Sequence, residues 1–219
     1  MPYTNDLVPG DRATPVRRLN LPADDEAAFR SMIPQAVTGE RDRPLAPPIG
    51  GPPHRRGAVL VLLYPVDGDW HLPLTVRTAA LRRHSGEVSL PGGRYDESDG
   101  TLDQTALREA WEELGIVPAE VEIVGRLMPV WIPVSNFLIL PVVGLATKPP
   151  TFTPASAEVA EVVEVSLQML SLPTTRQLVH RIIRGVDCAV PCFVVAGHEV
   201  WGATAIILAQ LLNRLHLQA

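Results

Sequence analysis

The sequence lacks any long apolar run, and this absence excludes one class of protein. No stretch of about 18 apolar residues occurs in the chain of 219 residues, so no membrane-spanning helix is expected. Lysine and arginine form no long block and the formal net charge is −5, which argues against a general nucleic-acid binder. The opening residues, MPYTNDLVPGDR, lack a basic start followed by an apolar stretch. We therefore expect no secretory signal and a cytoplasmic protein without membrane or nucleic-acid partners.

The sequence also has few cysteines. The chain has two cysteines, Cys188 and Cys192, whose spacing matches neither a redox CxxC pair nor a zinc framework. We interpret them as reduced thiols in or near the core, in preference to a disulfide. Apolar residues make up 46% of the sequence, which is ample for a buried core. The length favours one domain of ordinary size with extensions.

Proline divides the chain into two parts. Residues 1–54 carry ten of the 22 prolines, several of them in the segment APPIGGPP. Because proline donates no backbone hydrogen bond, this N-terminal extension is not expected to join the central sheet and is predicted to be largely peripheral. Acids at the start of residues 24–32 predict one short helix within it. The globular domain is predicted to span residues 55–219.

The globular part combines strand-like segments with helical ones. Compact segments with strand character occur at 57–64, 71–77, 86–91, 121–132, 137–145 and 158–167. A helix is expected between the third and fourth of these segments. The apolar spacing of residues 201–217 predicts a terminal helix packed on the body. This order favours an α/β protein with a mixed sheet covered by helices.

Three glutamates crowd one turn of the helix between the third and fourth strands. A capping-box pattern at Thr101 and the glycine at Gly115 frame this helix. Glu109, Glu112 and Glu113 are spaced so that their carboxylates project from one face. The like charges repel, and the C-terminal end of a helix also disfavours negative charge. A divalent cation would remove this conflict, and a solvated acidic face is the alternative interpretation.

The residues around these glutamates resemble the Nudix box. That family pattern reads G, five residues, E, seven residues, and then R-E-U-x-E-E-x-G-U, with U apolar. The segment R-E-A-W-E-E-L-G-I, residues 108–116, fits the second half at each specified position. The first half departs from the pattern. After Gly93 and five further residues, the chain has Asp99 where the pattern has Glu, and eight residues rather than seven separate Asp99 from Arg108. This departure leaves the role of the first acid open.

The residues before the box resemble the signature of the coenzyme A pyrophosphatase branch of that family. The signature reads L-L-T-x-R-(S/A), three residues, R, three residues, G, three residues, F-P-G-G. The positions of this chain that match in register are Leu74, Thr75, Arg77, Arg82, Gly86, Pro91, Gly92 and Gly93. Pro73, Thr78 and Leu90 depart conservatively, and the Asp and the extra residue in the box are also familiar in this branch. Arg77 and Arg82 would suit a ligand rich in phosphate.

The resemblance implies a role for each residue of the site. The implied metal ligands are Glu109, Glu112 and Glu113. Glu112 is alternatively the water-activating base, and Arg108 is expected to orient the carboxylates. Glu158 is a candidate general base or extra ligand, and Glu161 competes for the same role. The implied substrate-binding residues are Arg77, Arg82, Gly92 and Gly93.

The resemblance also implies a Nudix fold, which is an α/β/α sandwich around a mixed β-sheet, and Mg²⁺ or Mn²⁺ as cofactor. The implied reaction is hydrolysis of the diphosphate of coenzyme A, or of acyl-coenzyme A, to 3′,5′-ADP and 4′-phosphopantetheine. Another nucleoside diphosphate derivative, such as ADP-ribose, or a dNTP is the alternative substrate. A non-catalytic nucleotide sensor is a second alternative, which the complete R-E-x-x-E-E pattern argues against. The sequence leaves the oligomeric state open.

Overall fold

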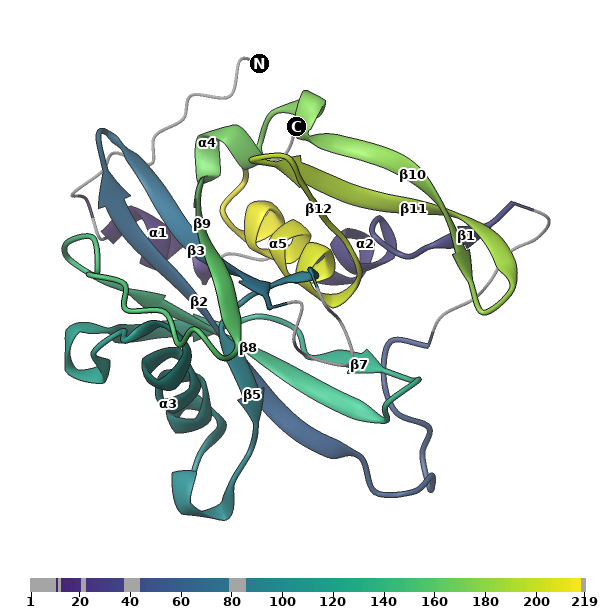
Figure 1. Cartoon of the computed structure of the whole chain (residues 1–219), viewed down its shortest axis with the longest axis horizontal. Coiled ribbons are helices and arrows are strands. Elements are labelled where there is room, and N and C mark those ends of the chain that lie inside the picture. The colour runs from purple at the N-terminus through teal and green to yellow at the C-terminus, as the bar shows by residue number, and fades with distance from the viewer. Residues whose placement is uncertain (1–10, 12, 21–22, 38–43, 79–85, 218–219) are drawn as a thin grey trace.

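The computed structural model of the chain describes residues 11, 13–20, 23–37, 44–78 and 86–217 (Figure 1). The α-helices are α1 (Ala13–Leu19), α2 (Asp25–Arg30), α3 (Leu102–Leu114), α4 (Leu167–Leu170) and α5 (Gly202–Arg214). The 3₁₀ helices are η1 (Glu97–Asp99), η2 (Pro118–Glu120) and η3 (Pro173–Thr175). The strands are β1 (Gln35–Ala36), β2 (Arg55–Val66), β3 (Asp69–Arg77), β4 (Val88–Ser89), β5 (Gly92–Arg94), β6 (Glu122–Arg126), β7 (Val130–Ile132), β8 (Phe137–Leu145), β9 (Val159–Ser166), β10 (Arg176–Ile183), β11 (Val186–Val195) and β12 (His198–Val200). Within the described ranges, no helix is long and apolar enough to cross a membrane.

The central sheet has eight strands of mixed direction. Its main path runs β4-β3-β2-β8-β6, while β5 pairs with β2, β7 with β8 and β9 with β3. β2 and β8 are parallel, and the other pairs are antiparallel. The predicted mixed sheet is therefore confirmed.

β2 has apolar residues at successive positions because it is covered on both faces. Leu60 and Leu62 pack in the cluster that contains the buried face of α3. Val61 and Leu63 point to the opposite side and pack in the cluster that contains α5. All four side chains are 0% exposed, as expected for a strand without a solvated face. The helices lie on the two sides of the sheet (Figure 1), which gives the α/β/α layers of the Nudix fold.

A second sheet of four strands was not predicted from the sequence. Its order is β1-β11-β10, and β12 also pairs with β11. Arg184 and Gly185, with φ of 54° and 76°, form the two-residue turn of the β10–β11 hairpin. Cys188 and Cys192 lie on β11, where both are buried and neither forms a disulfide. The interpretation of these cysteines as free core thiols is confirmed.

The prediction that residues 1–54 are largely peripheral is wrong for the described part of this segment. Phe29, Met32 and Ile33 are 0%, 2% and 8% exposed and belong to the same core cluster as α5. Arg214 of α5 donates from Nε to the two carboxylate oxygens of Asp25, at 2.8 and 3.1 Å. None of the described residues before β2 joins the central sheet, but β1 pairs with β11 of the second sheet. The prolines therefore exclude this segment from one sheet without keeping it out of the core.

The predicted elements otherwise appear with small shifts, and two of them differ. α2, α3, α5, β2, β3, β8 and β9 all overlap their predicted ranges. The predicted strand 121–132 is instead two strands, β6 and β7, which pair with different parts of β8. The predicted strand 86–91 is reduced to β4, since Pro91 has no N–H to donate to a ladder. The carbonyl of Pro91 instead accepts a hydrogen bond from the Leu60 N–H at 2.8 Å.

Candidate functional site

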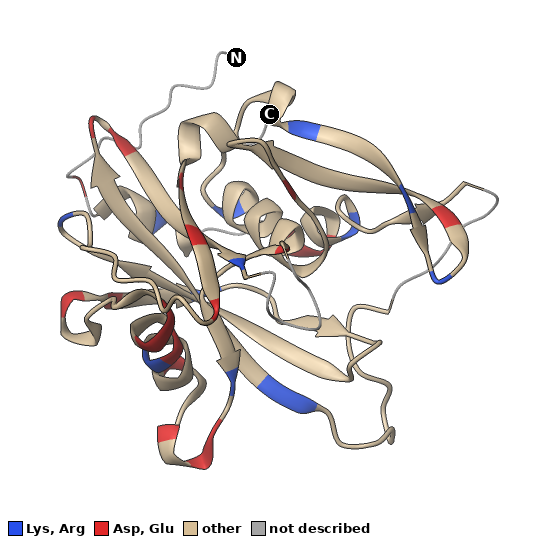
Figure 2. Ribbon diagram, viewed as in Figure 1, with Lys and Arg blue, Asp and Glu red and all other residues tan. Residues whose placement is uncertain are grey.

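α3 begins and ends where its capping residues predict. The Thr101 side chain accepts a hydrogen bond from the Gln104 N–H at 3.2 Å, and Gly115 ends the helix with φ of 72°. Ala110 and Leu114 are 0% exposed and pack on the side of β2. This packing leaves the acidic face of α3 directed at β5. Figure 2 shows acidic residues gathered on α3 and on the turn before it.

Arg108 is the centre of an ionic network on α3. Its Nε and Nη2 donate to the two carboxylate oxygens of Asp99 at 2.7 and 3.1 Å. It also contacts Glu109 at 2.9 Å and Glu112 at 3.0 Å. The hydrogen bonds between Asp99 and Arg108 lower the pKa of the carboxyl and raise that of the guanidinium. Asp99, whose role the sequence left open, therefore holds the arginine that contacts the two glutamates.

Thr105 belongs to the same network and was not singled out from the sequence. Its hydroxyl donates to Asp99 at 2.8 Å, and the Asp96 N–H donates to the same carboxylate oxygen at 3.1 Å. Asp96 and Asp99 form the capping box of η1. The acidic spacing of residues 96–99 is a sequence signal that could have indicated this turn. The turn fixes Asp99, which in turn fixes Arg108.

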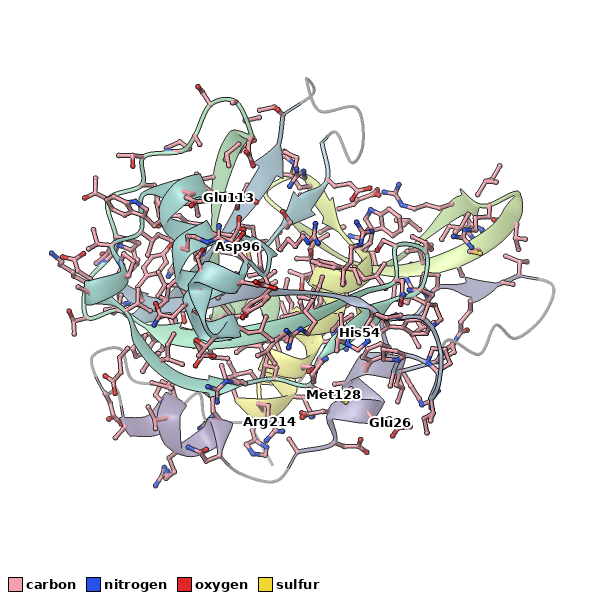
Figure 3. The ribbon with its side chains drawn as sticks, turned by 90° about the horizontal axis from the view of Figure 1, so that it is seen from below. Glu26, His54, Asp96, Glu113, Met128 and Arg214 are labelled. Carbon is pink, nitrogen blue, oxygen red and sulfur yellow. The ribbon has the colours of Figure 1, made fainter. Side chains whose placement is uncertain are left out.

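Glu113 is the most buried carboxylate on the acidic face of α3 (Figure 3). It is 6% exposed, and its carboxylate accepts one long hydrogen bond of 3.4 Å from the Gly92 N–H. Burial raises the pKa of Glu113 from 4.5 to about 7, and the charges of Glu109 and Glu158 act in the same direction. The Gly92 N–H and the positive charge of Arg77 lower this pKa in part. A strongly perturbed carboxyl of this kind is typical of a functional site.

Glu109 lies against Gly93, the second of the two glycines of β5. Burial raises the pKa of Glu109, while the hydrogen bond from Arg108 lowers it. A Cβ atom on Gly93 would lie 2.5–2.6 Å from the carboxyl atoms of Glu109. A Cβ atom on Gly92 would lie 2.4 Å from the carbonyl oxygen of Ala58 on β2. The glycine pair, predicted to bind substrate, thus allows α3 and β2 to approach β5 closely.

The ends of β3 and β9 bring two further predicted residues to these carboxylates. Arg77, at the end of β3, lowers the pKa of Glu113 through its charge. Glu158, immediately before β9, raises the pKa of Glu113 and also that of Glu109. Glu161 instead contacts His198 of β12 at 3.3 Å. The charge effect of Glu158 on both glutamates, together with the contact of Glu161 to His198, favours Glu158 over Glu161 as the further acid of the site.

One predicted site residue lies away from the buried carboxylates, and another falls outside the described residues. Glu112 lies at the rim, with a side chain that is 55% exposed and is held by Arg108. Its charge contributes to the raised pKa of Glu109. Arg82, predicted to contact substrate, lies outside the described residues.

The carboxylates fit a divalent cation by their chemistry. Among the described residues, no three His, Cys, Asp or Glu side chains are placed to hold a metal ion together. Glu109 and Glu113 nevertheless form a pair whose negative charge is disfavoured by burial, and a cation would compensate it. Mg²⁺ is commonly bound by one or two carboxylates together with phosphate oxygens of the substrate. The site therefore suits an ion that a phosphate ligand helps to hold.

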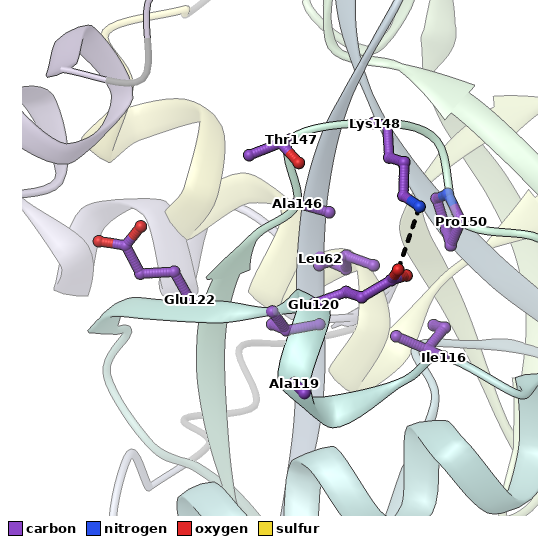
Figure 4. Close-up of a pocket in the computed structure, with 10 residues that line it drawn as sticks. Leu62, Ile116, Ala119, Glu120, Glu122, Ala146, Thr147, Lys148 and Pro150 are labelled. Atoms are coloured by element: carbon purple, nitrogen blue, oxygen red, sulfur yellow. Dashed lines mark ion pairs between the residues drawn. The ribbon is translucent and has the colours of Figure 1, made fainter.

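A cavity of about 290 Å³ follows the C-terminal end of α3 (Figure 4). It is lined by apolar residues that include Leu62 and Ile116, and by an ion pair between Lys148 and Glu120 at 3.1 Å. None of the predicted site residues that the structure describes lines it. The acidic site is thus separate from this cavity.

Comparison with known proteins agrees with the fold. Residues 54–184 match the model of the NUDIX domain, and the chain belongs to the Nudix family. It is 38% identical over 177 residues to a protein of Pectobacterium atrosepticum named uncharacterized Nudix hydrolase NudL, covering 75% of this chain and 86% of that protein. It is 36% identical over 191 residues to human mitochondrial coenzyme A diphosphatase NUDT8, covering 85% of this chain and 76% of that protein.

A solved structure shows the same fold. The crystal structure of a MutT/nudix family protein from Enterococcus faecalis superposes with a TM-score of 0.50 and 15% sequence identity. The match covers 94% of this chain and 74% of that protein.

Membership of the family identifies the class of protein. The chain is a Nudix hydrolase and therefore an enzyme, in a family that generally uses divalent metal ions and acts on small nucleotide derivatives. The cytoplasmic location stays a prediction, since the name of the human relative places that protein in mitochondria.

Proposed function

We propose that this enzyme hydrolyses the diphosphate of coenzyme A, or of acyl-coenzyme A, to 3′,5′-ADP and 4′-phosphopantetheine or its acyl derivative. The observation that carries the proposal is the effect of the Arg77 charge, which lowers the pKa of Glu113, because it links an arginine of the coenzyme A signature, at the end of β3, to the carboxylates of the box. The human relative named coenzyme A diphosphatase supports the same substrate.

Glu109 and Glu113 would hold Mg²⁺ or Mn²⁺ in this proposal. A bound divalent cation supplies positive charge to diphosphate oxygens and lowers the pKa of a coordinated water. Because carboxylates bind metal in their deprotonated form, Glu113 would release a proton when the ion binds near neutral pH. Glu112, at the rim, is the third proposed ligand or an alternative base.

The residues of the chain divide the remaining tasks. Arg77 would bind the anionic diphosphate, and Arg108 would keep Glu109 oriented while Asp99 holds Arg108. Glu158 would accept a proton from the water that attacks one phosphorus. The bond between that phosphorus and the bridging oxygen then breaks, and the leaving phosphate takes the electron pair.

Coenzyme A carries a 3′-phosphate that ADP-ribose lacks, so at least one arginine should recognise that group. Arg82 is the proposed contact, because it is the second arginine that the signature specifies. A hydrogen bond to a charged group contributes about 1.5–3 kcal/mol, which corresponds to roughly ten- to a hundredfold in affinity. Dephospho-coenzyme A should therefore be a poorer substrate by a similar factor.

The decisive experiment compares kcat/KM for coenzyme A, dephospho-coenzyme A, ADP-ribose and dNTPs, with Mg²⁺ and with Mn²⁺. We expect coenzyme A to give the highest value. Arg82→Ala should abolish the preference for the 3′-phosphate while preserving activity on dephospho-coenzyme A. Arg77→Ala should impair both substrates equally, because it would lose the diphosphate contact. Arg30→Ala, on α2, is the control for loss of a surface arginine.

Other outcomes distinguish the alternatives. A preference for ADP-ribose or a dNTP would overturn the coenzyme A proposal and leave the hydrolase assignment in place. Tight nucleotide binding without hydrolysis of any of these compounds would instead favour the sensor.

A further inference from the structure

The chain between β8 and β9 is tied to the C-terminal end of α3. The Thr153 N–H donates to the carbonyl of Leu114 at 2.8 Å, and the Ala155 N–H donates to that of Glu113 at 2.9 Å. These bonds satisfy carbonyls that a helix end leaves without intrahelical partners. A Cβ atom on Gly115 would lie 1.9 Å from Thr153 Oγ1, so the close approach depends on glycine. We call residues 153–158 the strap.

The other end of the strap is held by the residue that follows β3. The Thr78 N–H donates to the carbonyl of Glu158 at 3.0 Å, and the Thr78 hydroxyl donates to that of Ala157 at 3.1 Å. The pairing of β3 with β9 shifts register between Val76 and Arg77, directly before these contacts. Such a shift marks a bulge, where a strand bends and re-aims its side chains.

We propose that Thr78 is a positioning residue for Glu158. Its hydroxyl holds the carbonyl that precedes Glu158, and the strap thereby holds the backbone of Glu158 beside the C-terminal end of α3. The inference rests on the proposed role of Glu158 in hydrolysis and deepens it, because it names what determines the position of that side chain.

The local structure explains why this support is needed. Glu158 is exposed and lies in a turn, outside any helix or strand. Its backbone is held by the turn, where the N–H groups of Glu158 and Val159 both donate to the carbonyl of Ala155 at 2.9 Å, and by the bonds at the two ends of the strap. Removal of the Thr78 hydroxyl bond should move Glu158 relative to α3 without disturbing the helix.

The test compares Thr78→Val with Thr78→Ser. Valine keeps the shape and the N–H but loses the hydroxyl, and serine restores it. Loss of one hydrogen bond of ordinary net strength should lower kcat about three- to tenfold in Thr78→Val. The KM for coenzyme A should change by less than about twofold. Thr78→Ser should stay close to wild type. Thr147→Val is the matched control, because Thr147 is an exposed threonine earlier in the same connection.

A double-mutant cycle separates positioning from a general structural role. Glu158→Gln should lower kcat by about a hundredfold or more if Glu158 is the general base. Thr78→Val should then cause no further loss, since the group that it positions is already inactive. Amide hydrogen exchange of the metal-free protein gives a second reading. The N–H groups of Glu158 and Val159 should exchange faster than in wild type in Thr78→Val, and at the wild-type rate in Thr147→Val.

Each result supports or overturns the inference. Wild-type kcat in Thr78→Val, together with an impaired Glu158→Gln, overturns the positioning role and leaves Glu158 in place. The same fold-loss in both backgrounds also overturns it. Wild-type kcat in Glu158→Gln removes the proposed role of Glu158 and the inference with it. The substrate proposal is judged separately, because the cycle can use whichever nucleotide is hydrolysed. If valine does not fit, Thr78→Ala replaces it.

Discussion

Two buried carboxyls at the site behave in opposite ways because their partners differ. The side chain of Asp99 is 3% exposed, yet Arg108 lowers its pKa through two hydrogen bonds. Glu113 is more deeply buried and accepts one long hydrogen bond from Gly92, and burial raises its pKa to about 7. At this scale the partner, rather than burial alone, decides the protonation state. A bound cation would therefore compensate the negative charge of Glu113, which its one long hydrogen bond compensates only in part.

The stability of the metal-free protein should depend on pH through Glu113. Its pKa is 4.5 ordinarily and about 7 in the folded protein. Between these values the folded state binds more protons than the unfolded state, so the free energy of unfolding falls as pH rises. The fall is on the order of 3 kcal/mol at most. Glu113→Gln should therefore be more stable than wild type at pH 8 and similar to it at pH 4, measured by urea unfolding with a chelator.

Two controls accompany this prediction. Glu112→Gln should change the free energy of unfolding much less at either pH, because that side chain is at the rim. Saturating Mn²⁺ should stabilise wild type and should stabilise Glu113→Gln far less, since ligand binding to the folded state adds to stability. An identical difference between Glu113→Gln and wild type at both pH values would contradict the prediction.

Residue spacing predicted part of this site. The i, i+3 and i+4 positions of Glu109, Glu112 and Glu113 correctly indicated a shared helix face. Spacing could not show that Glu113 is buried while Glu112 is exposed, because burial depends on the backbone of β5. It also could not show that Arg108 contacts three acids at once, since Asp99 reaches it from a separate turn.

At the scale of the element, β5 is a short strand between β2 and α3. Its two glycines have no side chains, which allows both neighbours to approach closely. Gly92 faces the backbone of β2, where an added Cβ atom would lie 2.6 Å from the Cα of Val59. Gly93 faces the movable end of the Glu109 side chain. The first neighbour is rigid and the second can yield, so the two glycines should tolerate substitution differently.

Alanine at these two positions should separate stability from activity. Gly92→Ala forces the β2 backbone to shift and should destabilise the protein by about 1–3 kcal/mol, the usual cost of overpacking. Gly93→Ala can be accommodated by movement of the Glu109 carboxylate, so it should keep Tm close to wild type while lowering kcat more than tenfold. Thermal unfolding and steady-state kinetics of the two variants check this. Equal losses of Tm would show that the Gly93 neighbour is also rigid.

Elements with a continuous apolar run or clear capping residues could be predicted from the sequence. Elements that mix exposed apolar residues with charged ones could not. β2 and β8 show continuous apolar runs because they are buried, and α3 has clear caps. β10 has the sequence RQLVHRII, in which pairs of polar residues separate pairs of apolar ones, and it leaves Leu178 and Ile182 exposed, so its sequence resembles a surface segment. The two-residue turn at Arg184–Gly185 is the local signal that could have indicated this hairpin.

At the scale of the whole molecule, the N-terminal segment covers one end of α5. Phe29 and Met32 enter the core cluster, and Arg18 donates to the carbonyl of Leu215 at 2.7 Å. α5 is in turn part of the layer that covers the central sheet. The composition of the segment suggested a peripheral extension, but its few apolar residues lie where the helix would otherwise be exposed. The division of the chain into two parts at residue 54 stays a prediction from the sequence. The hydrophobic core includes residues from both sides of that boundary.

Removal of residues 1–53 should therefore destabilise the enzyme. The side chains of Phe29, Met32 and Ile33 each contribute about 1.5–3 kcal/mol by burial, so their loss approaches the total stability of an ordinary domain. A protein that begins at His54 should be largely insoluble or should unfold at a much lower Tm. A protein that begins at Asp11 keeps α1, α2 and β1 and is the matched control. Equal solubility and Tm of the two proteins would show that this covering is dispensable.

The parallel pairing of β2 with β8 also has a consequence during synthesis of the chain. β2 ends at Val66, and its partner does not begin until Phe137. The ribosome therefore releases one of the most apolar segments of the protein well before the strand and helices that cover it have been made. Such long-range pairing slows folding, and an uncovered apolar strand is prone to aggregate. The same strand that forms the centre of the finished enzyme is thus the segment of the nascent chain with the greatest need for a chaperone.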